Sequence, residues 1–128
     1  MTERTEREMS LDKYKLPLCL TEGVLITLDD APEVKITVAM PISSNRKFAF
    51  GWAKRLPMTQ DGKFEANPFD VMEAQRTELI ESCILKLEGV DNPETFFQDY
   101  PLVIEELWSK VQELLPTYEQ RLEDEAKN

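Results

Sequence analysis

The sequence predicts an α+β fold that is mainly α-helical, in which an N-terminal β-hairpin packs against about four helices. Two patterns support this class. Apolar side chains fall on every second position over residues 34–39, the period of a half-buried strand. Further along the chain they recur every three or four positions, the period of one helix face. The length of 128 residues fits one domain, which we expect to span residues 14–122.

The chain is expected to begin with a flexible arm, disordered or loosely docked, and to continue into the hairpin. Residues 1–13 carry charges of both signs and few apolar groups, a composition typical of disorder. Residues 24–28 are apolar and rich in β-branched side chains, and the turn-forming sequence DDAPE separates them from residues 34–39. A two-stranded hairpin alone is marginally stable in water, so its apolar face must pack on helices or on a partner.

Residues 46–55, RKFAFGWAKR, fit either a strand or a helix. In a strand, the aromatic residues Phe48, Phe50 and Trp52 share one face. In a helix, the buried stripe consists of Phe48, Ala49, Trp52, Ala53 and Leu56. The helix also places the basic residues together on the opposite face, and a preceding serine can cap its start. We therefore favour the helix, although Gly51 costs it about 1 kcal/mol relative to alanine.

Two helices are expected after a loop. An asparagine-proline pair at 67–68 predicts the start of a helix that runs to about residue 88 and stops at Gly89. Its apolar stripe comprises Met72, Leu79, Ile80, Cys83, Ile84 and Leu87. A second such pair at 92–93, followed by acidic residues, repeats the start signal for the next helix.

The last helix is expected to open at Pro101. Its apolar face comprises Ile104, Leu107, Trp108, Val111, Leu115, Tyr118 and Leu122. Because Pro116 falls inside this stripe, we expect a kink there or two helices end to end. The polar residues 123–128 form an acidic tail that we expect to fray.

The composition argues against an enzyme, a cofactor site and a metal site. Histidine, the commonest general base and metal ligand, is absent. Cys19 and Cys83 are too few for a zinc site, and we interpret them as buried thiols of a reducing compartment. The four glycines form no phosphate-binding loop. No apolar run approaches the roughly 20 residues of a membrane span, so we expect a cytoplasmic protein without a membrane partner.

Charge is distributed unevenly along the chain, whose net charge is −10. Residues 43–63, the basic island, hold five basic residues and one acidic residue, whereas residues 64–128 hold sixteen acidic and five basic residues. We predict that the basic island of one copy meets the acidic half of another, in a contact that repeats into a ring or a helical oligomer. The predicted interaction residues are Arg46, Lys47, Phe50, Lys54 and Arg55.

Two other functions fit the same stretch. It half-matches the RNA-binding signature of RRM domains, which suggests a small nucleic-acid-binding module using helix 46–55. The residues that fit are Arg46, Phe48, Ala49 and Phe50. Lys47, Gly51 and Ala53 do not fit, an RRM needs a four-stranded sheet, and the net charge opposes binding to phosphates. The second alternative is a regulatory adaptor.

The order of segments resembles that of the tail assembly chaperones of long-tailed bacteriophages. That order is a hairpin, a short basic helix, a loop and then ELIESCILKLEGVDNPETFFQDYPLVIEELWSKVQELL. The similarity covers roughly residues 20–115. It rests on the segment CILKLEG, taken as the end of a helix, on the acidic loop after it, and on DYP at the opening of the last helix.

The resemblance implies a function without catalytic residues. Chaperones of this family coat the long, helical tape measure protein in the host cytoplasm while tail tube subunits assemble around it. They are absent from the mature virion. Many are made in a short form that coats the tape measure and in a longer, frameshifted form that recruits tail tube protein. This chain resembles the short form.

Overall fold

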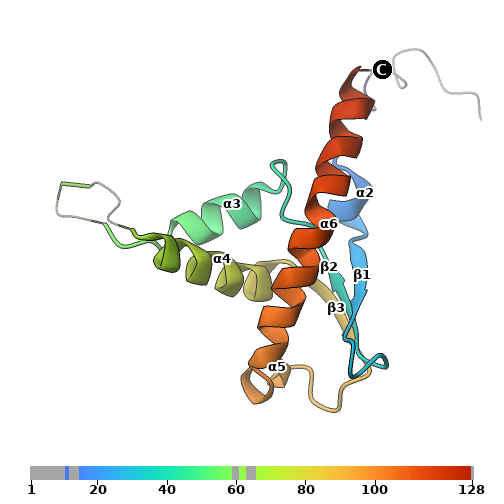
Figure 1. Cartoon of the computed structure of the whole chain (residues 1–128). Helices are drawn as coiled ribbons and strands as arrows, with labels where there is room; N and C mark the ends of the chain where they lie inside the picture. Colours follow the sequence, from blue (N-terminus) through green and yellow to red (C-terminus); the bar gives the residue numbers. More distant parts are fainter. Residues whose placement is uncertain (1–10, 12–14, 59–60, 63–65, 128) are drawn as a thin grey trace, which may run out of the picture.

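The computed structural model describes residues 11, 15–58, 61–62 and 66–127, with side chains through residue 120. The expected flexible arm, residues 1–13, lies outside the described residues except for Leu11, and the domain limits at 14 and 122 stay a prediction. Within the described part, five helices and one three-stranded antiparallel sheet form an α+β fold, which confirms the predicted class (Figure 1). The helices are α2 (Leu18–Thr21), α3 (Arg46–Ala53), α4 (Pro68–Ser82), α5 (Phe96–Asp99) and α6 (Leu102–Lys127).

The sheet contains the predicted hairpin and one further strand. β1 (Val24–Thr27) pairs with β2 (Lys35–Val38), and β2 also pairs with β3 (Ile84–Glu88), so β2 is the central strand. Ile26 of β1 lies opposite Ile36 of β2, which in turn lies opposite Leu87 of β3. This row of apolar residues belongs to the face of the sheet that contacts the core.

β3 corrects the prediction of one helix from residue 68 to residue 88. α4 ends at Ser82, Cys83 is its C-terminal cap, and the chain then enters the sheet as a strand. The pairing of β3 with β2 contains a bulge between Thr37 and Val38. As a result, the register partner of Thr37 is Lys86, whereas that of Val38 is Ile84. The segment CILKLEG is therefore mainly a strand and not the end of a helix.

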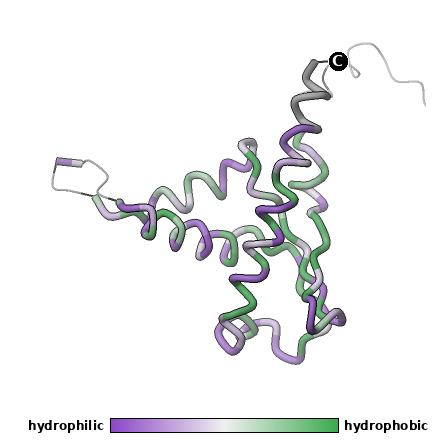
Figure 2. Tube along the Cα trace, in the orientation of Figure 1, coloured by the Kyte–Doolittle hydropathy of each residue, from purple (hydrophilic) through white to green (hydrophobic). Residues whose placement is uncertain are grey.

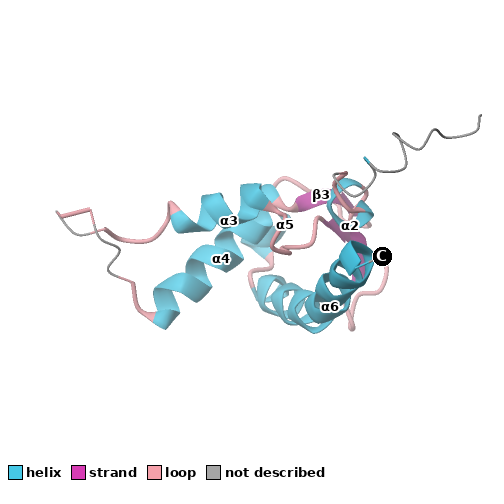
Figure 3. Ribbon diagram, turned by 90° about the horizontal axis from the view of Figure 1, so that it is seen from above, coloured by secondary structure: helices cyan, strands magenta, loops and turns pink. Residues whose placement is uncertain are grey.

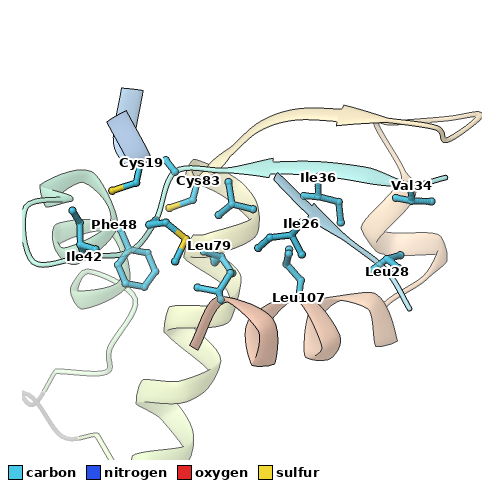
Figure 4. Packing of buried hydrophobic residues seen from close by; sticks show 14 of the residues in the cluster. Cys19, Ile26, Leu28, Val34, Ile36, Ile42, Phe48, Leu79, Cys83 and Leu107 are labelled. Carbon is cyan, nitrogen blue, oxygen red and sulfur yellow. The ribbon is translucent and has the colours of Figure 1, made fainter. Parts of the chain in front are cut away.

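The core lies between the sheet and α6. Ile36, Val38, Leu107 and Val111 are all fully buried where these two layers meet. Figure 4 shows Leu107 of α6 below Ile26 and Ile36 of the sheet, and Figure 2 shows hydrophobic residues along the strands. The buried cluster continues through Leu79 of α4 toward Phe48 of α3, so the root of α3 belongs to the same core. Cys19 and Cys83 are buried thiols, as predicted.

α6 is a single helix that passes through Pro116, which excludes two helices end to end. A proline removes the hydrogen bond to the carbonyl four residues earlier. Pro116 and Gln112 are both exposed, so the carbonyl that loses its partner belongs to a residue in contact with solvent. The predicted apolar face of α6 is buried or half-buried from residue 104 to residue 118. Backbone helix continues to Lys127, through most of the segment predicted to fray.

The short helix before α6 begins later than predicted. Asn92 precedes a turn over residues 93–95, and α5 starts after Thr95, whose hydroxyl donates a hydrogen bond to Asp99 (2.8 Å). Phe96, the first residue of α5, is buried in the core.

α3 and α4 form an arm that extends away from the sheet and α6. The two helices lie side by side over most of their length (Figures 1 and 3). We call α3, α4 and the described residues between them the arm. Because α4 leads directly into β3 and α3 follows β2, both roots of the arm are attached to neighbouring strands.

Candidate functional site

The start of α3 is fixed by Asn45, the residue before the helix. Its side chain accepts a hydrogen bond from the backbone N–H of Phe48 (3.1 Å), which is the cap that the sequence assigned to a preceding serine. Its amide nitrogen donates to the carbonyl of Met40 (3.1 Å) and to Sγ of Cys83 (3.7 Å). Because Cys83 caps the end of α4, one buried side chain ties together both roots of the arm.

Residues 46–53 are helical, which confirms the favoured interpretation of RKFAFGWAKR and excludes the strand. Phe48 is buried and Trp52 is half-buried against the core, as expected for the inward stripe. Ala49, which the sequence placed in the same stripe, is exposed. Phe50 is 62% exposed. Its exposure fits a helix, whereas a strand would have buried it with the other two aromatics.

The basic residues of α3 surround Phe50 on the solvent side. Arg46 and Lys47 open the helix and Lys54 caps its end, and all three are exposed. Arg46, Phe50 and Lys54 are spaced four residues apart, so they lie on one side of the helix. The structure thus groups four of the predicted interaction residues on one solvent-facing surface, whose binding role stays a prediction.

Arg55, the fifth predicted residue, is held within the molecule. Its Nε donates to Oε2 of Glu78 (2.8 Å), and its Nη2 donates to the carboxylate of Glu81. The hydrogen bonds to Glu78 and then Glu81 raise the pKa of Arg55. Burial favours the neutral form of Glu78, but hydrogen bonds from Arg55 and Ser82 outweigh it and lower the pKa of Glu78. The pair therefore stays ionised at neutral pH and joins α3 to α4.

Gly51 makes room for that ion pair. A Cβ atom at this position would lie 1.9 Å from Oε1 of Glu78 and 2.2 Å from its Cδ. Both distances are far shorter than a van der Waals contact, so any side chain here would displace the carboxylate. The glycine costs helix stability, but it allows a buried carboxylate to approach the helix and bind Arg55.

Gly51→Ala is expected to destabilise the protein, although alanine is the better helix former. Displacing Glu78 weakens charge-assisted hydrogen bonds that contribute about 1.5–3 kcal/mol, whereas the gain in helix propensity is about 1 kcal/mol. In a Glu78→Ala background the overlap is gone, so Gly51→Ala should stabilise the protein by about 1 kcal/mol. Urea unfolding of the four proteins measures both effects. If Gly51→Ala changed the free energy of unfolding in the same direction with and without Glu78, this interpretation of Gly51 would be contradicted.

Large apolar side chains are also exposed on the arm. Phe69 and Met72 of α4 and Met58 of the connecting loop join Phe50 among the exposed large hydrophobic residues. The sequence placed Met72 in the buried stripe of α4, which is wrong because the first turns of α4 lie in the part of the arm beyond the core (Figure 1). The sequence did not indicate that Phe69 and Met58 are exposed, because spacing alone does not distinguish apolar residues that face the core from those that face solvent.

The exposed face of α3 presents cations and an aromatic ring to solvent, and further apolar side chains are exposed elsewhere on the arm. Within the described residues, no group of three or more histidine, cysteine, aspartate or glutamate side chains is arranged to hold a metal ion. No described helix has the length and apolar character needed to cross a membrane.

Comparison with protein-family models, curated proteins and solved structures finds no match to this chain.

Proposed function

We propose that this protein is a non-enzymatic tail assembly chaperone of a long-tailed bacteriophage. It self-associates and coats the tape measure protein in the host cytoplasm during tail morphogenesis, and it is not part of the mature virion. A longer, frameshifted form recruits the tail tube protein. The chain uses no cofactor, and its partners are other copies of itself and the tape measure protein.

One observation carries the proposal: a basic helix face with an exposed aromatic residue is displayed on an arm that extends from an acidic body. Among the described helices, α3 is the one with a net positive charge, whereas α5 and α6 in the body, meaning the described residues outside the arm, and α4 in the arm are each net negative. The basic face and the acidic body are different surfaces of one molecule. A contact between them repeats from copy to copy, which suits a protein that coats an elongated partner.

The sequence resemblance supports the same function through the order of elements. The hairpin, the short basic helix, the loop and the following helices occur in the order that the family resemblance implies. The segment CILKLEG differs, because most of it is a strand of the sheet. The resemblance therefore contributes through its overall layout and through the last helix, and the exposed face of α3 contributes independently.

Self-association should depend on salt and on the face of α3. We expect species larger than a dimer at low salt that become smaller as ionic strength rises, because exposed charges are screened over about 10 Å at 0.1 M. Lys54→Glu should reduce their size, and Phe50→Ala should do so while changing the free energy of unfolding by no more than about 0.5 kcal/mol. Light scattering and thermal melts measure the two quantities.

Lys35→Glu is the matched control, because it makes the same charge change at an exposed position on β2. The control should assemble like the wild type. In co-expression with tape measure protein, Lys54→Glu should leave more of that partner insoluble than Lys35→Glu does. A wild-type chain that stays monomeric at low salt and high concentration would overturn the proposal.

A nucleic-acid-binding module is the second candidate, and the same surface favours it. Arg46, Lys47 and Lys54 are exposed cations around an exposed aromatic ring that is available for base stacking. We expect titration of a labelled single-stranded oligonucleotide at low salt to give only millimolar or weaker binding, because the net charge of −10 repels the phosphates. Tight binding that weakens steeply with salt would favour this candidate over the chaperone.

A further inference from the structure

A groove of about 660 Å³ lies between α4, β3, α5 and α6, and sequence reasoning did not foresee it. Among its apolar residues are the half-buried Ile80, Ile84, Leu87 and Phe97, which all pack against the core. These side chains come from α4, from β3 and from α5. The groove therefore offers apolar surface that no described segment of the chain covers completely.

Acidic residues line the rim of this groove. Glu73 and Glu81 of α4, Glu94 before α5 and Glu105 of α6 are all exposed there. Arg76 is the one cation among the lining residues, and it lies near Glu105 (3.8 Å between Nη1 and Oε1). Glu81 is paired with Arg55, which lies outside the groove lining, whereas Glu73 and Glu94 have no ion pair within the described part of the chain. The groove is therefore apolar at its base and negative at its rim.

We propose that the groove receives the exposed face of α3 from a second copy of this chain. Phe50 then contacts the apolar base, while Arg46 and Lys54 contact the acidic rim. The two cations are eight residues apart, which separates them by about 12 Å along a helix. This inference rests on the proposed self-association and names the surface that accepts the basic face.

Charge complementarity selects a second copy as the occupant. A segment that fits needs an apolar anchor flanked by cations, and α3 is the one described helix with a net positive charge. Figure 1 shows α3 on one side of α4 and α5, which lines the groove, on the other. A chain cannot fill its own groove with its own α3, so each copy presents one acceptor and one donor, and the contact repeats.

Two double variants separate the donor from the acceptor. The donor variant, Arg46→Glu with Lys54→Glu, makes the α3 face negative. The acceptor variant, Glu73→Lys with Glu94→Lys, makes the groove rim positive without touching the ion pairs of Arg55 and Arg76. A control variant, Glu113→Lys with Glu119→Lys, makes the same charge change as the acceptor variant at exposed positions of α6 outside the groove.

Sedimentation velocity at low salt gives a distinct expectation for each protein. The wild type and the control should assemble. The donor variant alone and the acceptor variant alone should each need a protein concentration at least about tenfold above that of the wild type for the same degree of assembly. The reason is that like charges then face each other at the contact. An equimolar mixture of donor and acceptor variants should assemble again, since every donor face then meets a groove of opposite charge. A mixture of donor and control variants should form shorter assemblies than the control alone, because a donor variant accepts an α3 face in its groove but presents none and so ends the chain.

The remaining outcomes distinguish this inference from the proposed function. If the wild type assembles and the acceptor variant assembles as readily as the control, the groove is not the acceptor, while self-association stands. The same conclusion follows if the mixture of donor and acceptor variants fails to assemble. If the wild type itself remains monomeric at low salt, the proposed function and this inference both fall.

Discussion

Leu107→Ala is expected to lower the free energy of unfolding by about 2–5 kcal/mol, the usual cost of truncating a buried leucine. Leu107 is fully buried where α6 packs on the sheet. The substitution removes apolar surface from the core and leaves a cavity between two layers held apart by other side chains. A small domain has a total stability of about 5–15 kcal/mol, so the loss is a large share of it.

Urea unfolding followed by circular dichroism measures this effect, with Leu102→Ala as the matched control. Leu102 begins the same helix but is 77% exposed, so its truncation should change stability by no more than about 0.5 kcal/mol. Equal losses for the two variants would show that α6 does not pack on the sheet through Leu107.

Gly89→Ala is expected to be comparably destabilising for a reason that lies in the backbone. Gly89 has a positive φ of 79°, and a Cβ atom there would lie 2.0 Å from the carbonyl oxygen of Glu33. The left-handed conformation costs a non-glycine residue about 1–2 kcal/mol, and relieving a clash typically costs a further 1–3 kcal/mol. Because the atom in the way is backbone, a change of rotamer cannot relieve the overlap.

Gly62→Ala separates these two costs. Gly62 has the same positive φ of 79°, but nothing lies within 4 Å of the place where its Cβ would stand. Its substitution should therefore cost about 1–2 kcal/mol from backbone conformation alone. Thermal melts of both variants measure the difference. If Gly89→Ala costs no more than Gly62→Ala, the turn before β2 does not approach Gly89 as closely as the structure indicates.

β3 shows why periodicity predicted the fold class but not every element. The bulge in the β2–β3 pairing places Ile84 and Leu87 on the inner face, three residues apart, with Leu85 and Lys86 exposed between them. A spacing of three is the spacing of a helix face. The strand therefore continued the pattern of α4 without a break, and only pairing with a distant segment distinguishes the two. The β1–β2 hairpin was predictable because its alternation is regular.

The candidate site was predictable to the extent that it depends on local sequence. The spacing of Phe48 and Trp52 predicted a helix, and that helix exposes Phe50 with its neighbouring cations. The pairing of Arg55 with Glu78 was not predictable, because it joins residues 23 positions apart. The same contact explains Gly51, which from the sequence only lowers the stability of the helix. The groove was not predictable either, because four separate elements contribute to it.

The position of Asn45 at both roots of the arm has a consequence for any assembly built from repeated copies. Its hydrogen bonds to Met40 and Cys83 fix the direction of the arm relative to the sheet. In a filament whose subunits are all related by the same contact, each subunit repeats the angle between its donor face and its acceptor groove. Small variations of this angle from subunit to subunit therefore add up along the filament. A buried amide that holds this angle gives such a filament a uniform pitch.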